Sequence, residues 1–524
     1  MSNNKTVLVR ALWAALAGLV SGYAALAAAE LVSAWVRPES GPLTAVGGGA
    51  IDRTPAAVKD WAIRNFGTND KLVLQAGILV VIALLAMGLG VLSLRWRRIA
   101  AAGVALFGVV GAAAALERPD SESFSDAVPS LVGGLIGGVL LYVLAGLLTA
   151  RPESRDADAG RAWDRRRFLV ATGAAAVGGT VAGGVGRALN SSSARDAVAS
   201  RAAVVLPRPV STAPPVPAGA ALRVPGVSPF TTPNRDFYRV DTALVVPKVT
   251  TGEWSLRIHG KGVRRELRLS FDDLLRRELI ERDITLTCVS NEVGGPYVGN
   301  ARWLGARLSE LLAEAGVRPP SRGGTADQLV ARSVDGMTLG SPVEDVMDGR
   351  DALLAVGMNG EPLPFEHGFP VRMLVPGLYG YVSACKWIED IELTTFDAYD
   401  PYWVKRKWAR KAPIKTQARI DTPKPFGRPK TGTVMVAGVA WAQHRGIDRV
   451  EIRVDDGPWQ PADLAPEATR DTWRQWSFPW RAVPGTHTLT VRATDRTGET
   501  QTERRTRTVP DGASGWHSVV VTAD

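Results

Sequence analysis

The chain has 524 residues, a formal net charge of +10, two cysteines and five histidines. At roughly 100–200 residues per domain, this length predicts about three structural units. Two cysteines exclude a disulfide-rich scaffold and a four-cysteine zinc or iron–sulfur site. The basic charge is scattered and no nucleic-acid-binding motif accompanies it, so we expect no nucleic-acid partner. Apolar residues gather before residue 190 and polar residues after it, which excludes both a purely soluble enzyme and a pure transporter.

Four charge-free apolar runs near the N-terminus are long enough, or nearly long enough, to cross a bilayer as helices. A buried hairpin of core helices is the alternative, but a soluble core rarely holds four such runs in succession. We therefore expect residues 1–150 to form a four-helix membrane domain that acts as an anchor. Lysines and arginines in the short loops place the N-terminus, the loop between the second and third runs, and the segment after the fourth in the cytoplasm. The runs are Ala11–Ala29, Leu72–Leu94, Ile99–Leu116 and Ala127–Ala150.

Residues 151–190 contain a fifth, mildly apolar run, Phe168–Gly186, directly after three arginines. The segment Arg165-Arg166-Arg167-Phe168-Leu169 resembles a twin-arginine export signal, which carries folded proteins across the membrane. Alternatively, the arginines mark the cytoplasmic end of a fifth span. Under either interpretation we expect a multi-pass protein of the cell membrane whose polar half lies outside the cytoplasm.

The polar half begins with a linker and divides into two folded regions. Ser191–Pro217 is small, polar and then proline-rich, which predicts a semi-extended linker over residues 191–223. Residues 224–410 mix short strand-like and helical stretches, so we expect an α+β domain there. Residues 411–524 are dominated by strands and turns, which predicts an immunoglobulin-like β-sandwich.

Local patterns support this division. Trp254–His259 alternates as a strand does, and Ser270 with Asp273 three residues later predicts an N-capped helix. Leu304–Gly316 predicts an amphipathic helix that ends at a glycine. In the C-terminal region we expect strands over Gly432–Ala440, Val450–Val454 and Gly485–Ala493.

Cys288 lies at the end of an alternating apolar strand, a position that delivers its thiol to a strand terminus. A lone cysteine is more often a small buried hydrophobic residue. Distinctive segments follow it in order, however: Gly299–Gly305, Met358–Arg372, Val375–Tyr381 and Lys386–Ile388. This arrangement resembles the sulfite oxidase family of molybdopterin enzymes, which has a strand-borne cysteine followed by Ala-Arg-Trp-x-Gly, His-Gly-Phe-Pro-x-Arg and Val-Pro-Gly…Lys-Trp segments. The resemblance covers roughly residues 224–510 and includes the sandwich, which resembles the family's C-terminal dimerisation domain.

The resemblance implies molybdenum and molybdopterin as cofactors. Cys288 would be the thiolate ligand of molybdenum, a soft ligand for a metal already held by the soft sulfurs of the pterin. Arg239 aligns with the arginine near the metal that sulfite oxidases use for the anion, which makes it catalytic together with Cys288. Arg372 would bind phosphate through its planar fork and Lys386 through a point charge. The implied cofactor-binding residues are Asn234, Tyr238, Arg239, Cys288, Ser333, His367, Arg372, Ser383 and Lys386. Asn291 matches a family asparagine three residues after the cysteine.

Other interpretations of neighbouring residues remain open. Arg302 and Trp303 could serve the site or form a surface cation–π pair. Cys385 is expected to be a small buried residue, and a disulfide with Cys288 is the alternative.

The sequence also departs from true sulfite oxidases. Glu292 and Val293 stand where the family has arginines after the cysteine, and Val356 replaces an expected pocket tyrosine. Because a sulfite pocket needs clustered positive charge, a neutral substrate such as a sulfoxide is an equal alternative.

The resemblance therefore predicts oxygen-atom transfer on a small molecule, as sulfite oxidation or sulfoxide-type reduction. No haem-binding domain precedes the pterin domain and no Cys-x-x-Cys-His motif is present, so we expect a separate electron carrier, a cytochrome or a quinone-linked protein. A homodimer is a further expectation from the sandwich. The competing hypothesis is a non-catalytic, membrane-tethered binding protein that retains the fold.

Overall fold

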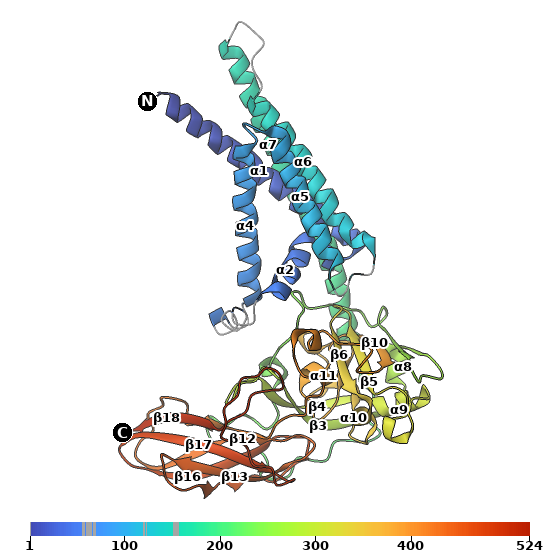
Figure 1. The fold of residues 1–524 in the computed structure, drawn as a ribbon, viewed down its shortest axis with the longest axis vertical. Coiled ribbons are helices and arrows are strands. Elements are labelled where there is room, and N and C mark those ends of the chain that lie inside the picture. Colours follow the sequence, from blue (N-terminus) through green and yellow to red (C-terminus); the bar gives the residue numbers. More distant parts are fainter. Residues whose placement is uncertain are drawn as a thin grey trace. The chain divides into compact units, whose positions relative to one another are not determined.

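The computed structural model describes residues 2–54, 58, 65–66, 70–118, 121, 123–149 and 157–524. It divides into two compact units. The first comprises Met1–Asp196 with Ala243–Val246, and the second comprises Ala197–Thr242 with Pro247–Asp524. The first unit is built of helices, and the second is built mainly of strands (Figure 1).

The helical unit contains the apolar runs as helices. Those over Val7–Val36, Leu72–Leu92, Arg97–Leu116, Phe124–Thr149 and Arg166–Ala203 are, in the described part of the chain, the ones long and apolar enough to cross a membrane, by length and composition only. They correspond to the four predicted runs and to the fifth. The elements are α1 (Ser2–Val36), η1 (Pro38–Ser40), α2 (Pro42–Arg53), α4 (Asp70–Leu92), α5 (Arg97–Leu116), η3 (Phe124–Ala127), α6 (Val128–Thr149) and α7 (Ala157–Ala203).

Small residues let these helices pack closely. A Cβ atom added at Gly18 of α1 would lie 2.0 Å from the carbonyl oxygen of Ala86 on α4, and one at Gly134 of α6 would lie 2.6 Å from the Cα of Gly108 on α5. Close backbone approach through glycine is typical of helices that associate in lipid. The outward faces stay apolar, as at the exposed Leu84. A helix that is apolar all round belongs in a core or in a membrane.

Helix α7 corrects one expectation about the linker. It contains Phe168–Gly186 and continues without a break to Ala203, so residues 191–203 are helical and not extended. The reason is local: the first proline after this stretch is Pro207, and the preceding serines and alanines do not interrupt a helix. Of the predicted topogenic arginines, Arg151 and Arg155 lie outside the described residues, as do the side chains of Arg161 and Arg165.

The remainder of the predicted linker is attached to a sheet. The backbone N–H of Val210 donates to the carbonyl of Leu279 (2.8 Å), and that of Glu281 donates to the carbonyl of Ser211 (2.8 Å). Leu206 also packs on the hydrophobic core of the second unit. This segment therefore lies along the strand that ends before Cys288.

Two sheets form the part of the second unit that precedes the sandwich (Figure 1). One has the strand order β2-β1-β10-β5-β6. The other has the order β3-β4-β7-β8, and β9 also pairs with β7. The strands are β1 (Ser255–Gly260), β2 (Leu267–Ser270), β3 (Leu279–Thr287), β4 (Val298–Arg307), β5 (Gln328–Ser333), β6 (Thr338–Pro342), β7 (Leu353–Met358), β8 (Glu361–Pro362), β9 (Arg372–Leu374) and β10 (Ile388–Thr394). Short helices connect them: α8 (Phe271–Leu275), α9 (Leu308–Glu314), α10 (Val343–Met347) and α11 (Gly380–Ser383).

Most local predictions in this part are confirmed. Strand β1 covers the alternating segment, and α8 begins with a capping box in which Ser270 and Asp273 bond each other's backbone N–H groups. The helix predicted from Leu304 begins only at Leu308, because β4 continues to Arg307. The last residues of β4 pair with β3 on one side and with β7 on the other. The hydrogen bonds of these two pairings outweigh the helical pattern of the sequence there.

The C-terminal region is a β-sandwich of two four-stranded sheets, ordered β11-β12-β16-β15 and β14-β13-β17-β18. The three predicted strands correspond to β12, β13 and β17. Trp441 and Trp473 of this region belong to the core of the preceding sheets, so the two parts share one hydrophobic core. The strands are β11 (Gln417–Thr422), β12 (Gly432–Trp441), β13 (Ile447–Val454), β14 (Gln460–Pro461), β15 (Asp463–Leu464), β16 (Arg474–Ala482), β17 (Gly485–Asp495) and β18 (His517–Ala523).

Candidate functional site

Strand β3 delivers Cys288 to the site, as the alternating pattern predicts. The strand ends at Thr287, and the backbone N–H of Cys288 donates to the carbonyl of Tyr297 (3.0 Å). Its Sγ lies 2.9 Å from the Oγ of Ser290. The side-chain oxygen of Asn291 accepts from the backbone N–H of Tyr297 (2.7 Å), which closes the loop after the cysteine. Burial raises the pKa of the Cys288 thiol above its usual value.

A cavity of about 130 Å³ opens beside Cys288. Its lining brings together predicted residues that are far apart in the chain, namely Tyr238, Ser333, His367, Arg372 and Lys386. Three predicted residues, Asn234, Arg239 and Ser383, do not line it.

Arg372 at the start of β9 is the most informative residue of the cavity. Its side chain is buried, with the residue only 5% exposed, and Nη1 donates to the carbonyl of His367 (3.1 Å). Its Nε has no partner, and the described residues place no carboxylate at ion-pair distance from it. Burial lowers the pKa of Arg372 to about 10. A buried cation without a counter-charge is costly, so this guanidinium indicates an anion that binds in the cavity.

Ser333 supplies a second polar group without a partner. It ends β5, is 1% exposed and lines the cavity. Its Oγ has no hydrogen-bond partner among the described residues. A buried hydroxyl of this kind is normally satisfied, so Ser333 and Arg372 together leave donors available for one ligand.

His367 is held neutral at the cavity wall. Its Nε2 donates to the backbone carbonyl of Asn234 (2.9 Å), and burial lowers the pKa of the imidazole to about 4. Gly368 follows with φ +109°, and a Cβ atom there would lie 3.0 Å from the Cβ of Arg372 and 3.1 Å from the Cα of Lys386. This position needs glycine both for its left-handed backbone and for the close approach of the three functional residues.

Lys386 and Arg239 share a carboxylate that the sequence analysis did not single out. The Nζ of Lys386 lies 2.7 Å from an oxygen of Asp241, and the Nε of Arg239 lies 2.8 Å from the same oxygen. Burial lowers the pKa of Lys386 to about 8. The side chain of Arg239 is 34% exposed and does not line the cavity, whereas Asp241 does. Arg239 is therefore directed to Asp241, unlike the anion-binding arginine that the resemblance implies.

Asn234 and Ser383 support the walls of the cavity from behind. The Nδ2 of Asn234 donates to Glu361 (2.5 Å), and its Oδ1 accepts from Asn359 (2.8 Å). Because its own carbonyl accepts from His367, Asn234 ties the turn at Asn359 to the histidine. The Oγ of Ser383 donates to backbone carbonyls of the preceding turn, so it is satisfied within the fold.

The structure resolves the open alternatives around these residues. Arg302 forms a bidentate pair with Asp283 (2.9 and 2.8 Å) across β3 and β4. Arg372 lies over the Trp303 ring, 5.0 Å from its centroid, and Arg302 pairs with Asp283 instead of forming the alternative cation–π pair with Trp303. Cys385 is buried and free, which excludes the disulfide alternative in this structure.

An aromatic and apolar wall closes the other side of the cavity. Trp403, Trp408 and Tyr381 line it together with Met337. The rings of Trp403 and Trp408 are 6.2 Å apart and those of Tyr381 and Trp408 are 5.6 Å apart. Sequence reasoning missed this wall, because the tryptophans lie more than one hundred residues after Cys288 and carry no motif.

The comparisons with known proteins concern the domain that holds this site. Residues 243–403 match the family model of the oxidoreductase molybdopterin binding domain. The chain is 30% identical over 293 residues to the mitochondrial sulfite oxidase of Rattus norvegicus (48% of this chain, 53% of that protein). It is 29% identical over 306 residues to the mitochondrial sulfite oxidase of Homo sapiens (50% and 55%). Residues 243–403 therefore form an oxidoreductase molybdopterin-binding domain, and the chain is similar to sulfite oxidases.

A solved structure, the sulfane dehydrogenase SoxCD from Paracoccus pantotrophus, aligns at 25% identity with a TM-score of 0.49, covering 56% of this chain and 82% of that chain. The chain spans about half the length of the curated relatives it matches. The matched family model describes an oxidoreductase domain that binds molybdopterin, which implies a molybdenum cofactor.

The sandwich holds the strand that leads to Cys288. The Nε2 of Gln443 donates to the carbonyl and hydroxyl oxygens of Thr285 and Thr287 (3.0 Å each). The backbone N–H of Thr285 donates to the carbonyl of Asp471 (2.9 Å). Asp471 in turn lies 3.1 Å from the Nδ1 of His444. Thr285 and Thr287, two of the last three residues of β3, are thus fixed by groups from the C-terminal region.

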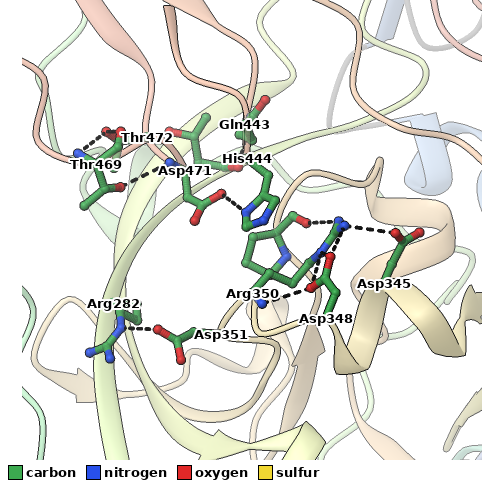
Figure 2. Close-up of polar contacts among 12 residues, drawn as sticks. Arg282, Asp345, Asp348, Arg350, Asp351, Gln443, His444, Thr469, Asp471 and Thr472 are labelled. Carbon is green, nitrogen blue, oxygen red and sulfur yellow. Dashed lines mark hydrogen bonds and ion pairs between the residues drawn. The ribbon is translucent and has the colours of Figure 1, made fainter. Parts of the chain in front are cut away.

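Figure 2 shows Gln443, His444 and Asp471 of this region together with the neighbouring Arg350. The imidazole faces Asp471, and Arg350 lies beside it. Arg350 pairs with Asp345 (2.9 Å), which lies in α10, and with Asp348 (2.7 Å), which directly follows that helix. Arg350 also donates to the carbonyl of Pro376 (3.0 Å), so it holds together the loops that face the corner between β12 and β13.

Proposed function

We propose that the chain is a membrane-anchored, molybdopterin-dependent oxidoreductase that transfers an oxygen atom to or from a small molecule outside the cytoplasm. The observation that carries the proposal is the buried, unneutralised guanidinium of Arg372 in the same cavity as the Cys288 thiol. A phosphate-bearing cofactor supplies the missing negative charge, and a thiol beside it supplies a protein ligand for its metal.

The proposed roles follow from the contacts. When bound, the molybdenum–pterin group supplies a metal centre that exchanges an oxygen atom and an electron pair with a substrate. Cys288 contributes the ligand sulfur, and metal coordination deprotonates a thiol even where burial raises its pKa. Tyr238 lies in the cavity as a phenol, because burial raises the pKa of its hydroxyl.

We expect the phosphate of the cofactor to bind the hydrogen-bond donors that have no partner among the described residues of the protein. Arg372 offers a free Nε and Ser333 a free hydroxyl. Lys386 adds a second positive charge next to them, and its ion pair with Asp241 fixes its position. Neutral His367, held by Asn234, forms the adjoining wall. Ser383 and Asn234 act as supports, and Arg239 acts through Asp241.

The substrate that the cavity favours is a neutral sulfoxide more than sulfite. A dianion requires free positive charge, but Asp241 binds both Arg239 and Lys386. Glu292 is exposed and Val356 is buried in the core, so neither supplies an anion contact. The aromatic wall of Trp403 and Trp408 suits an organic group. We expect kcat/KM for an alkyl aryl sulfoxide to exceed that for sulfite, and a sulfite preference would contradict this assignment.

The membrane part of the proposal rests on the apolar helices and on the distribution of basic residues. The first four spans anchor the chain, and a twin-arginine-like signal or a fifth span places residues after 190 outside the cytoplasm. The proposed functional regions are the membrane domain (1–150), the signal or fifth span (151–190), the linker (191–223, helical up to residue 203), the molybdopterin-binding domain (224–410) and the sandwich (411–524). An immunoglobulin-like topology for the sandwich, a homodimer through it, and a separate cytochrome or quinone-linked electron carrier complete the proposal.

Metal and pterin analysis of the purified full chain tests the proposal. One molybdenum and one pterin per chain support the oxidoreductase. Absence of both, in protein produced in cells that make the cofactor, favours the competing function, a membrane-tethered binding protein that retains the fold.

A further inference from the structure

The helical unit contains an apolar cavity of about 600 Å³ among α1, α2, α4, α5 and α6. Ligand cavities of roughly 300–1,000 Å³ hold organic molecules of drug size. Along α4 the lining extends from Val73 to Leu89, about 24 Å at 1.5 Å per residue, so the cavity is long. Among the described residues that line it, none is charged and Ser130 is the one polar side chain.

Ser130 has an unsatisfied hydroxyl. The residue is 2% exposed, and its Oγ has no hydrogen-bond partner in the described part of the chain. A serine within a helix usually bonds a carbonyl one turn earlier, but Ser130 lies in the first turn of α6, directly after η3. It faces α5, since a Cβ atom at Gly111 would lie 2.8 Å from its Oγ. In a region without water, an unpaired hydroxyl is costly, so it indicates a ligand with an acceptor atom.

We propose that this cavity binds an isoprenoid quinone. A quinone combines a long uncharged hydrocarbon tail with a ring carbonyl at one end, and that carbonyl can accept a hydrogen bond from the Ser130 hydroxyl. The lack of charged lining favours an uncharged head over a phospholipid phosphate. Ser130 and Gly111 lie at the end where α5 ends and α6 begins, and Leu89 lies at the opposite end of α4. In the proposed topology, the ring is therefore near the outer surface and the tail points toward the bilayer centre.

The inference rests on the membrane location within the proposed function and not on the chemistry of the molybdopterin domain.

Two glycines of α4 provide a matched pair of variants. A Cβ atom would meet nothing within 4 Å at either Gly77 or Gly88, yet only Gly77 lines the cavity. Leucine at Gly77 therefore fills the cavity, and leucine at Gly88 adds the same bulk elsewhere on the helix.

The experiment titrates decylubiquinone into the full chain reconstituted in phosphatidylcholine nanodiscs. We expect saturable binding of one molecule per chain, retained in Gly88→Leu and lost in Gly77→Leu. Ser130→Ala should weaken binding roughly five- to tenfold, the worth of one hydrogen bond. The proposal is overturned if decylubiquinone does not bind saturably in the phosphatidylcholine nanodiscs. It is also overturned if Gly77→Leu and Gly88→Leu bind with equal affinity, or if Ser130→Ala leaves the affinity unchanged. Molybdenum is measured in the same samples, so failure here with full metal content leaves the proposed oxidoreductase intact.

Discussion

Arg372 is a buried cation next to an aromatic ring and a backbone carbonyl, and no acid of the described residues forms an ion pair with it. Its Nη1 donates to the carbonyl of His367, and Trp303 covers one face of the guanidinium. Such an arrangement destabilises the protein by itself and is favourable only with a bound anion. Function and stability therefore make opposite demands on this residue.

Replacing Arg372 with methionine should separate the two demands. In protein from a host that cannot make molybdopterin, Arg372→Met should raise the free energy of unfolding by roughly 1–3 kcal/mol, because it removes a buried unpaired charge. In a host that makes the cofactor, the same variant should contain little molybdenum and pterin. Arg372→Lys should retain an intermediate amount, since lysine keeps the charge but loses the fork. Full cofactor content in the methionine variant would contradict the phosphate assignment.

At the residue scale, the sequence identified groups whose place follows from chain order. Cys288 ends a strand, and His367 and Arg372 are brought together by a short turn through Gly368. The side-chain partner of Arg239 was not predictable, because Asp241 attracts it only in the folded backbone. The unsatisfied hydroxyl of Ser333 likewise became visible only when all neighbouring donors and acceptors were placed.

Strand β3 is the element on which the site depends, and it is held at its end by the C-terminal sandwich. Gln443→Leu removes two hydrogen bonds to Thr285 and Thr287 and should cost roughly 2–3 kcal/mol of stability. Because these bonds hold the residues directly before Cys288, the variant should also lose bound cofactor faster on dilution. Gln460→Leu, at an exposed position of β14, is the control. Equal stability and equal cofactor loss in both variants would show that the sandwich does not support the site.

Elements with a clear period were predictable, and those decided by tertiary pairing were not. Strands β1, β12, β13 and β17 follow alternating patterns, and α8 follows its capping box. Leu304–Arg307 reads as helix in the sequence but joins β4, because strands on both sides pair with it. The helical residues 191–203 were misjudged from their small polar composition, which tolerates a helix when no proline intervenes.

The whole molecule combines an apolar helical unit with a cofactor-binding unit, so the export route decides where catalysis occurs. Changing Arg165 and Arg166 together to lysine keeps the positive charge but removes the guanidinium pair. We expect the first four spans to insert normally while residues 190–524 stay in the cytoplasm with their molybdenum. Protease treatment of intact spheroplasts reports the location of the catalytic half. Equal accessibility in variant and parent would mean that the arginines act only as topogenic charge.

The central claim is that Cys288 is the protein ligand of molybdenum, and X-ray absorption at the molybdenum edge of the loaded full chain tests it most directly. We predict that Cys288→Ala retains folded protein and bound pterin, abolishes turnover and lowers the sulfur coordination of the metal by one. Cys385→Ala is the matched control, because this second buried thiol is free and lies outside the cavity lining. It should leave the spectrum unchanged. An unchanged sulfur count in Cys288→Ala would contradict the account.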